Sequence, residues 1–160
     1  MQTIRLIQPQ DDAQIAQLIR TTLVDYDLAQ AGTAYDDPEL DHLSQYYLAD
    51  PQRRAYYVAE TARGEFLGGI GFSEFAALAE CVEVQKLYLD PAAQGQGIGR
   101  ALLARLEYEA QSRGYRRLYL ETHSRLTAAL KFYAKHSFYE IDRPAGVIHS
   151  SMDRFFMKEL

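Results

Sequence analysis

The chain has 160 residues, 48% of them hydrophobic, a size typical of one folded domain, so we expect a single domain over residues 1–160. The 17 basic and 22 acidic residues give a net charge of −5 at pH 7, which argues against a protein that coats nucleic acid or anionic membranes. The single cysteine, Cys81, excludes an internal disulfide framework or a thiolate-rich metal cluster, and the sequence shows neither a membrane-length apolar run nor an N-terminal secretory pattern, so we expect a cytoplasmic protein.

The first 50 residues predict one strand and two helices. Residues 3–7 are typical of a strand that Pro9 ends, and Asp11 and Asp12 are natural caps for a following helix. A second, shorter helix is expected near residues 39–48, before Asp50 and Pro51. The first helix has an apolar stripe at three- and four-residue spacing, formed by Ile15, Leu18, Ile19, Thr22 and Leu23.

The rest of the chain mixes hairpin and crossover patterns. Residues 56–60 and 66–72 predict a hairpin, and residues 81–89 a long strand. Helices are expected from Ile98 to Ala110 and around residues 126–133, and further strands at residues 117–121, 138–141 and 154–158. The order β-α-α-β-β-β-α-β-α-β-β predicts an α/β (mixed α+β) chain whose sheet has antiparallel and parallel parts and carries helices on its faces.

The most informative segment is residues 87–100, LYLDPAAQGQGIGR, where a strand runs through a glycine-rich turn into a helix. The first turn of a helix has unpaired N–H groups and partial positive charge, and glycines let an anion approach closely, so the segment can hold phosphate. Arg100 follows Gly99 where a P-loop requires Lys, and the G-x-G-x-G spacing differs from a dinucleotide fingerprint. A tight turn that only ends the strand is the alternative.

Two segments resemble a known family. Residues 94–99, QGQGIG, resemble the Q/R-x-x-G-x-G/A signature of the GCN5-related N-acetyltransferases (GNAT). Residues 128–138, AALKFYAKHSF, are similar to the second signature of that family, which usually ends Y-x-x-x-G-F; here Ser137 replaces the glycine, and Leu126 stands where many members have asparagine. The tail from Gly146 to Asp153 is similar, less specifically, to the G-x-x-H-x-x-x-D ending of a bacterial subgroup.

The resemblance implies a GNAT-like acyl-CoA N-acyltransferase fold, with a mostly antiparallel mixed sheet and helices on both faces. It also implies acetyl-CoA as co-substrate, no metal, and direct transfer of the acetyl group to the amine of a small molecule or peptide without a covalent acyl-enzyme. A backbone N–H near Leu87 or Tyr88 would polarise the thioester carbonyl. The residues expected to contact the cofactor are Leu87, Tyr88, Leu89, Gln94, Gly95, Gln96, Gly97, Ile98, Gly99 and Arg100.

Two residues are candidates for proton transfer. Tyr133 occupies the position of the usual general acid in the family, although it also completes the apolar stripe of its helix and reads equally as a core aromatic. Glu83 is the candidate base, because strand alternation would place Glu83, Gln85, Leu87 and Leu89 on one side of the strand. The alternative for Glu83 is a solvated or paired charge.

Charge is distributed unevenly. Residues 21–52 contain no Lys or Arg, but they include Asp36 and Asp37 in a run of acidic residues. In the family this region commonly covers the acceptor, so an acidic lid would favour a cationic amine, with Tyr26, Tyr35, Asp36 and Asp37 as candidate substrate contacts. A solubilising surface is the alternative.

Competing functions remain open from the sequence. The same fold could use another acyl-CoA or a hydroxyl acceptor, and a catalytically silent CoA-binding module that regulates a partner would carry the same signatures. Both a monomer and a homodimer are compatible with the sequence.

Overall fold

The computed structural model describes residues 1–147 and 149–160 and is built around a mixed sheet in the order β1-β2-β3-β4-β5-β7-β6. Strands β4 and β5 run parallel, and the other neighbouring pairs are antiparallel, which confirms a mixed, mostly antiparallel sheet. The strands are β1 (Gln2–Leu6), β2 (Arg54–Thr61), β3 (Phe66–Glu74), β4 (Cys81–Leu89), β5 (Arg117–Thr122), β6 (Tyr139–Ile141) and β7 (Arg154–Glu159).

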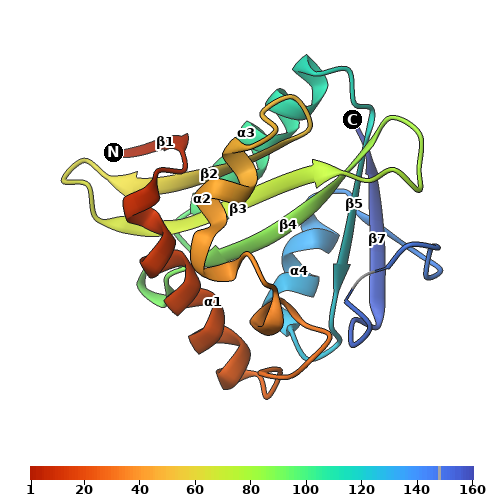
Figure 1. Cartoon of the computed structure of the whole chain (residues 1–160), viewed down its shortest axis with the longest axis horizontal. Coiled ribbons are helices and arrows are strands. Elements are labelled where there is room, and N and C mark those ends of the chain that lie inside the picture. The colour runs from red at the N-terminus through yellow and green to blue at the C-terminus, as the bar shows by residue number, and fades with distance from the viewer. Residues whose placement is uncertain (148) are drawn as a thin grey trace.

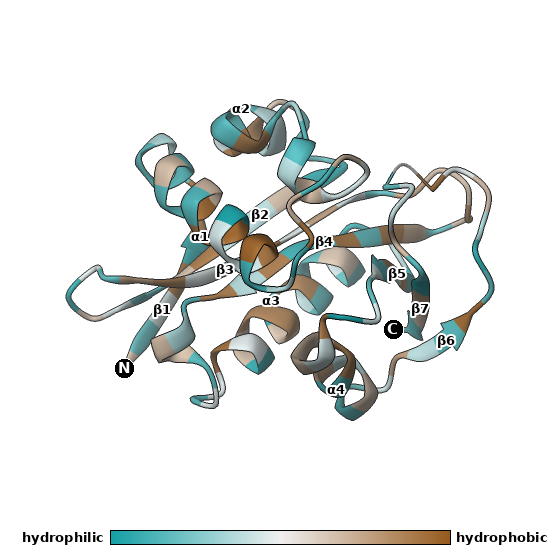
Figure 2. Cartoon of the chain, turned by 90° about the horizontal axis from the view of Figure 1, so that it is seen from below, coloured by the Kyte–Doolittle hydropathy of each residue, from teal (hydrophilic) through white to brown (hydrophobic). Residues whose placement is uncertain are grey.

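Helices cover both faces of this sheet, as Figures 1 and 2 show. Three residues of the predicted stripe of α1, Ile15, Ile19 and Leu23, are buried together with α2 against the face of β2 to which Tyr56 and Val58 point. Helix α3 packs on the opposite face, against Ala55 and Tyr57. Within the described residues, no helix combines the length and apolar character that a membrane crossing needs. The helices are α1 (Asp12–Asp25), α2 (Leu43–Leu48), α3 (Ile98–Ser112) and α4 (Thr127–Lys135).

The predicted element order is confirmed, with two local differences. The second predicted helix is divided into a 3-10 turn, Leu40–His42, and the short α2. The expected caps of α1 are wrong, since no side chain caps its start. The carboxylate of Asp11 instead accepts the backbone N–H of Gln8 at 2.7 Å, and Asp12 accepts the N–H of Ser44 at 2.8 Å and thereby ties α1 to α2.

The sheet opens between its two parallel strands. The pairing of β4 with β5 begins at Cys81 and ends at Glu83, opposite Tyr119, although β4 continues to Leu89. Beyond Glu83 the two strands part (Figure 1), while β5 stays paired with β7 as far as Thr122. Backbone groups on this side of β4 therefore face a gap that another molecule can fill.

A bulge in β4 lies at the mouth of this gap. Gln85 and Tyr88 pair with Gly71 and Gly69, so β4 contains one residue more than β3 in this interval, and Lys86 has φ 51°. The Tyr56 hydroxyl donates to the Lys86 carbonyl oxygen at 2.9 Å. Glycine is required on β3, because a Cβ at Gly69 would lie 2.4 Å from Cε1 of Tyr56.

The bulge reverses the facing of side chains along β4. Leu87 and Leu89 pack with the cluster on the α3 side, whereas Glu83 and Gln85 face the α2 side, where Tyr47 donates to Gln85 at 2.8 Å. The prediction that Glu83, Gln85, Leu87 and Leu89 share one side is therefore wrong. An extra residue shifts the two-residue period by one, and each later side chain changes face.

Candidate active site

A cavity of about 350 Å³ occupies the gap between β4 and β5. Because the gap passes between strands, both faces of the sheet contribute walls: Tyr26 comes from the α1 side, and Phe132 and Tyr133 come from α4. Its size is typical of a small-molecule site. The other lining residues used below are Glu83, Gln85, Lys86, Leu87, Tyr88, Leu89, Gln94, Gly95, Gly99, Glu121, Leu126, His149 and Met152.

The start of α3 forms one end of the cavity. Gly95 and Gly97 have φ values of 76° and 80°, and Cβ atoms added at either would meet open space, so conformation rather than crowding requires glycine there. Gly99 has a packing role, since a Cβ would lie 3.1 Å from the Phe132 ring. No side chain caps the start of α3, which leaves the N–H groups of its first turn available to an anion.

The candidate cofactor residues divide into two groups. Six of them line the cavity: Leu87, Tyr88, Leu89, Gln94, Gly95 and Gly99. Gln96 and Ile98 line a separate depression beside the N-terminus, Arg100 is exposed on the first turn of α3, and Gly97 is the N-cap residue. Side chains of this second group therefore lie outside the described cavity lining, and only their backbone N–H groups belong to the turn that a diphosphate could contact.

Glu83 lies at the other end of the cavity, where the two strands begin to part. Gln85 Nε2 donates to Glu83 Oε1 at 2.6 Å, and the buried Tyr47 hydroxyl orients Gln85 in turn. Burial, together with the neighbouring Glu121, raises the pKa of Glu83 to about 7. A carboxyl group with this pKa exchanges a proton readily near neutral pH.

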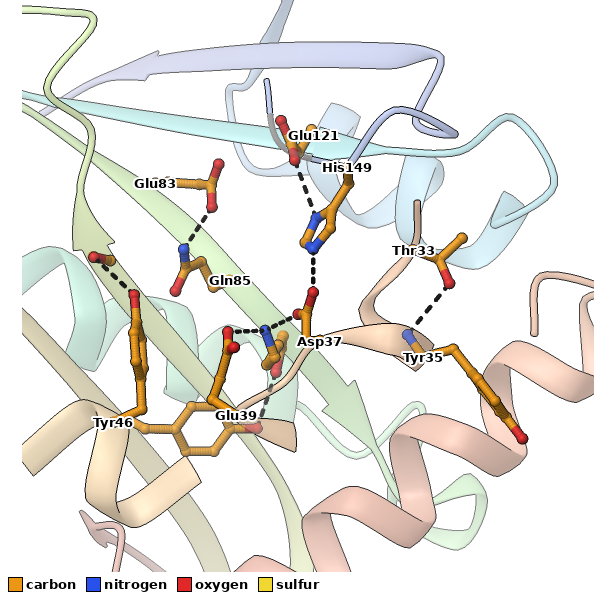
Figure 3. Close-up of polar contacts among 12 residues, drawn as sticks. Thr33, Tyr35, Asp37, Glu39, Tyr46, Glu83, Gln85, Glu121 and His149 are labelled. Atoms are coloured by element: carbon orange, nitrogen blue, oxygen red, sulfur yellow. Dashed lines mark hydrogen bonds and ion pairs between the residues drawn. The ribbon is translucent and has the colours of Figure 1, made fainter. Parts of the chain in front are cut away.

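His149 joins two carboxylates beside Glu83 (Figure 3). Its Nε2 lies 2.7 Å from Asp37 Oδ1 and its Nδ1 lies 3.1 Å from Glu121 Oε1. Burial by itself lowers the pKa of His149, but the hydrogen bonds to Asp37 and Glu121 outweigh it and raise the pKa to about 9. The ring is therefore an imidazolium at neutral pH, donating from both nitrogens. Lys86 Nζ lies 2.6 Å from the other oxygen of Asp37, Oδ2.

Tyr133 belongs to the core and to the cavity at once. Its ring packs edge-on against Phe138, with centroids 5.4 Å apart, and the residue also lines the cavity. In the described part of the chain no hydrogen-bond partner reaches its hydroxyl, and burial raises the pKa of the phenol. The group is therefore protonated at neutral pH and free to donate into the cavity.

The four candidate acceptor residues are not brought together. Tyr26 lines the cavity, whereas Tyr35 and Asp36 lie outside its described lining, and Figure 3 shows the Tyr35 side chain directed away from the carboxylates. Asp37 reaches the site through the cavity-lining residues His149 and Lys86. The acidic segment thus supplies a buried ion pair at Asp37.

Sequence reasoning did not assign Glu121, Lys86 or His149 to the site. A pattern pointed only to His149, through the G-x-x-H-x-x-x-D tail, and nothing local marks the other two. Ser137, which replaces the glycine of the second signature, has φ 67°, the backbone conformation for which glycine is preferred. Leu126 lines the cavity as an apolar residue.

Comparisons with known proteins identify the family and agree with the fold. A sequence profile described as the acetyltransferase (GNAT) family matches residues 19–138. The chain is 34% identical over 145 residues to the "uncharacterized N-acetyltransferase YjgM" of Escherichia coli (strain K12), which covers 89% of this chain and 85% of the relative. An acetyltransferase of the GNAT family from Staphylococcus aureus Mu50 superimposes with a TM-score of 0.88 at 19% identity, over 100% of this chain and 99% of the other. The structure of yncA from Salmonella typhimurium, solved with acetyl-CoA, gives a TM-score of 0.77 at 23% identity, over 100% and 94% of the two chains.

Proposed function

The chain belongs to the acetyltransferase (GNAT) family and is an acyltransferase that uses acetyl-CoA, and from this premise we propose that it transfers the acetyl group directly to the amine of a small molecule or peptide. One observation carries the proposal: a single cavity is lined by the glycine turn, by Glu83 and by Tyr133. An anion site, a proton acceptor and a proton donor thus share one space.

Two parts of the chain would bind the cofactor, the glycine turn at the start of α3 and the backbone of β4 after the bulge. The N–H groups of residues 96–100 would hold the diphosphate at the start of α3. Leu87 and Leu89 lie beyond the part of β4 that pairs with β5, so their backbone groups on that side would form hydrogen bonds with the amides of the pantetheine arm, as neighbouring strands do with each other. A backbone N–H at Leu87 or Tyr88 would polarise the thioester carbonyl, and acetyl-CoA supplies the activated acetyl group.

Proton transfer is assigned to Glu83 and Tyr133. Glu83 accepts a proton from the acceptor ammonium, whose pKa is about 10, and the amine nitrogen then forms the new bond to the acetyl carbon as the bond to sulfur breaks. The second proton that the nitrogen loses on becoming an amide balances the proton that the departing sulfur gains as coenzyme A leaves as a thiol. Raising the Glu83 pKa from 4.5 to about 7 lowers the cost of that proton transfer from about 7.5 to about 4 kcal/mol. Tyr133 donates a hydrogen bond to the leaving sulfur.

The position of Cys81 favours direct transfer. The thiol is buried in a cluster with Phe75 and Tyr119 and lies outside the described lining of the cavity. Burial raises its pKa to about 11, which disfavours the nucleophilic thiolate. A covalent acyl-cysteine is therefore not part of the proposal.

Charges at the acceptor end favour a cationic amine without a nearby carboxylate. Among the described lining residues the basic side chains are Lys86 and His149, and both already pair with Asp37. A carboxylate on the acceptor would meet Glu83 and Glu121 with no free cation to offset them. The acceptor class that fits is a primary amine whose remaining part is apolar or aromatic, against Tyr26 and Met152.

Matched acceptor pairs test this function. Primary amines and the α-amino acids that differ from them by one carboxylate, such as tyramine and tyrosine, are compared by release of free thiol from acetyl-CoA. We expect kcat/KM to favour the amine at least tenfold, and mass spectrometry to find the acetyl group on its nitrogen. Preference for the amino acid would contradict the acceptor class, and acetylation of a hydroxyl group would contradict N-acetylation.

A further inference from the structure

Three carboxylates from different parts of the fold meet at the acceptor end of the cavity, and two of them are fully engaged. Asp37 accepts from His149 through Oδ1 and from Lys86 through Oδ2. Glu121 faces His149 with Oε1, and its Oε2 accepts from the Tyr119 hydroxyl at 3.0 Å. Neither carboxylate has an oxygen without a partner.

Glu83 differs from the other two. Its Oε1 accepts from Gln85, and within residues 1–147 and 149–160 no donor reaches its Oε2. The group also lines the cavity, so this oxygen is the one that an incoming ammonium can meet. What distinguishes Glu83 from Glu121 is therefore the histidine between Glu121 and Asp37.

We propose that His149 is a positioning residue of the acceptor site: by engaging both Asp37 and Glu121, it leaves Glu83 as the one carboxylate available to the acceptor amine. The acceptor part of this statement rests on the proposed function. The histidine would act on the reaction only through the carboxylates that it holds.

Hydrogen bonds fix the chain that follows His149. Ser151 donates from its backbone to Gly32 O at 3.2 Å and from its hydroxyl to Ala31 O at 2.9 Å, and the N–H of Met152 donates to His149 O at 3.1 Å. The His149 ring therefore connects three segments: the chain before β7, which carries it, the chain after the turn Ala34–Asp36, through Asp37, and β5, through Glu121. It fastens three segments over one end of the cavity.

Electrostatics give the reason that a cation is needed there. The charged groups around His149 are Asp37 and Glu121 in direct contact, Lys86 and Glu39 beyond Asp37, and Glu83 beside Glu121. Without the imidazolium, Glu121 would face Glu83 as an unpaired like charge and compete with it for the ammonium. The substrate amine would then bind partly at Glu121, away from Glu83. The added negative charge would also keep Glu83 protonated at higher pH.

A double-mutant cycle of His149→Gln and Glu121→Gln tests the proposal, with the exposed His42→Gln as matched control. At pH 7 we expect His149→Gln to lower kcat about tenfold or more and to move the acid limb of kcat/KM upward. The double variant should recover most of the lost turnover, since without the Glu121 charge the histidine is no longer needed. A double variant as impaired as His149→Gln would overturn the proposal, because a merely structural histidine is not rescued in this way.

A second readout separates this proposal from the proposed function. The ionisation of Glu83 is followed by NMR of ¹³C-carboxyl-labelled glutamate, and the Glu83→Gln variant identifies its resonance. We expect the midpoint to rise in His149→Gln, to fall in Glu121→Gln and to stay unchanged in His42→Gln. An unchanged midpoint in His149→Gln would contradict the role of His149, whereas the expected shifts without thiol release from any amine would contradict the proposed function alone.

Discussion

Tyr133 shows how one residue can serve packing and chemistry. Its ring lies against Phe138 and Phe156, and its hydroxyl is not engaged by the described part of the chain. Packing holds the ring in one orientation, so the hydroxyl is presented to the cavity without the entropic cost of ordering a mobile side chain. The alternative interpretations of Tyr133, core aromatic and proton donor, are thus compatible in this structure.

Tyr133→Phe separates the two roles. The ring and its packing remain, so we expect stability and coenzyme A affinity to change little. Turnover should fall about ten- to a thousandfold, the range for loss of an acid–base group. The measurement is kcat by thiol release, with the exposed Tyr108→Phe on α3 as control. Turnover within twofold of the unmodified protein would leave Tyr133 a packing residue only.

His149 links residue-scale electrostatics to stability. The pKa of His149 in the folded state, about 9, lies above the ordinary value of 6.5. Its contribution to the free energy of unfolding is therefore fully present below about pH 6.5 and is lost as the pH rises through about 9. We expect His149→Gln to reduce the free energy of unfolding most near pH 6, by at most about 3 kcal/mol, and progressively less toward pH 10. Urea titrations at a series of pH values measure this, and a difference that grows with pH would contradict it.

At the scale of elements, the bulge in β4 determines the site. It lets a single strand present Glu83 to one face of the sheet and Leu87 to the other, so that residues from both faces line the gap. Tyr56 supports the bulge in two ways. Its ring packs over the glycines of β3, and its hydroxyl donates a hydrogen bond to the Lys86 carbonyl oxygen. Strain at Lys86 is thus compensated by a hydrogen bond from β2, which β3 separates from β4 in the sheet.

Tyr56→Phe tests that dependence. The substitution leaves the ring and removes the hydrogen bond to Lys86 O, so a largely buried carbonyl loses its partner. We expect a loss of about 1–3 kcal/mol in unfolding free energy and a lower kcat/KM. The neighbouring Tyr57→Phe, on the opposite face, is the matched control and should leave kcat/KM unchanged. Equal kinetic effects of the two substitutions would show that the bulge does not need this bond.

At the scale of the whole molecule, helices cover both faces of the sheet, and the sheet is interrupted where β4 and β5 separate. The cavity lies between these two strands. A ligand that fills this gap would join the two halves of the sheet. We therefore expect cofactor binding to stabilise the molecule globally as well as at the glycine turn.

Acetyl-CoA should raise the melting temperature. A ligand at 100 times its Kd stabilises the native state by about 2.7 kcal/mol, which corresponds to a shift of about 5–10 °C for a chain of this size. Differential scanning calorimetry with acetyl-CoA, and with pantetheine as a control that lacks the diphosphate, measures the contribution of the turn. Equal shifts from both ligands would argue against diphosphate binding at residues 96–100.

The order of elements could be predicted from the sequence because local patterns encode it. Apolar spacing located α1 and α3, and alternation with flanking turns located β2 to β4. Two short signatures indicated the family for the same reason, since a diphosphate turn needs glycines at fixed spacing along the chain. Tyr133 was named from the second signature and Glu83 from its place on the strand before the glycine turn, and both line one cavity.

Tertiary structure alone decided how the acceptor site is assembled. The reversal at Lys86 follows from Tyr56, 30 positions earlier, and the contact of His149 with Asp37 joins residues 112 positions apart. Alternation and spacing describe neighbours in sequence, whereas a bulge and a buried ion cluster arise when distant segments satisfy one another's charges and hydrogen bonds. Glu83 was therefore identifiable from the sequence, and its surroundings were not.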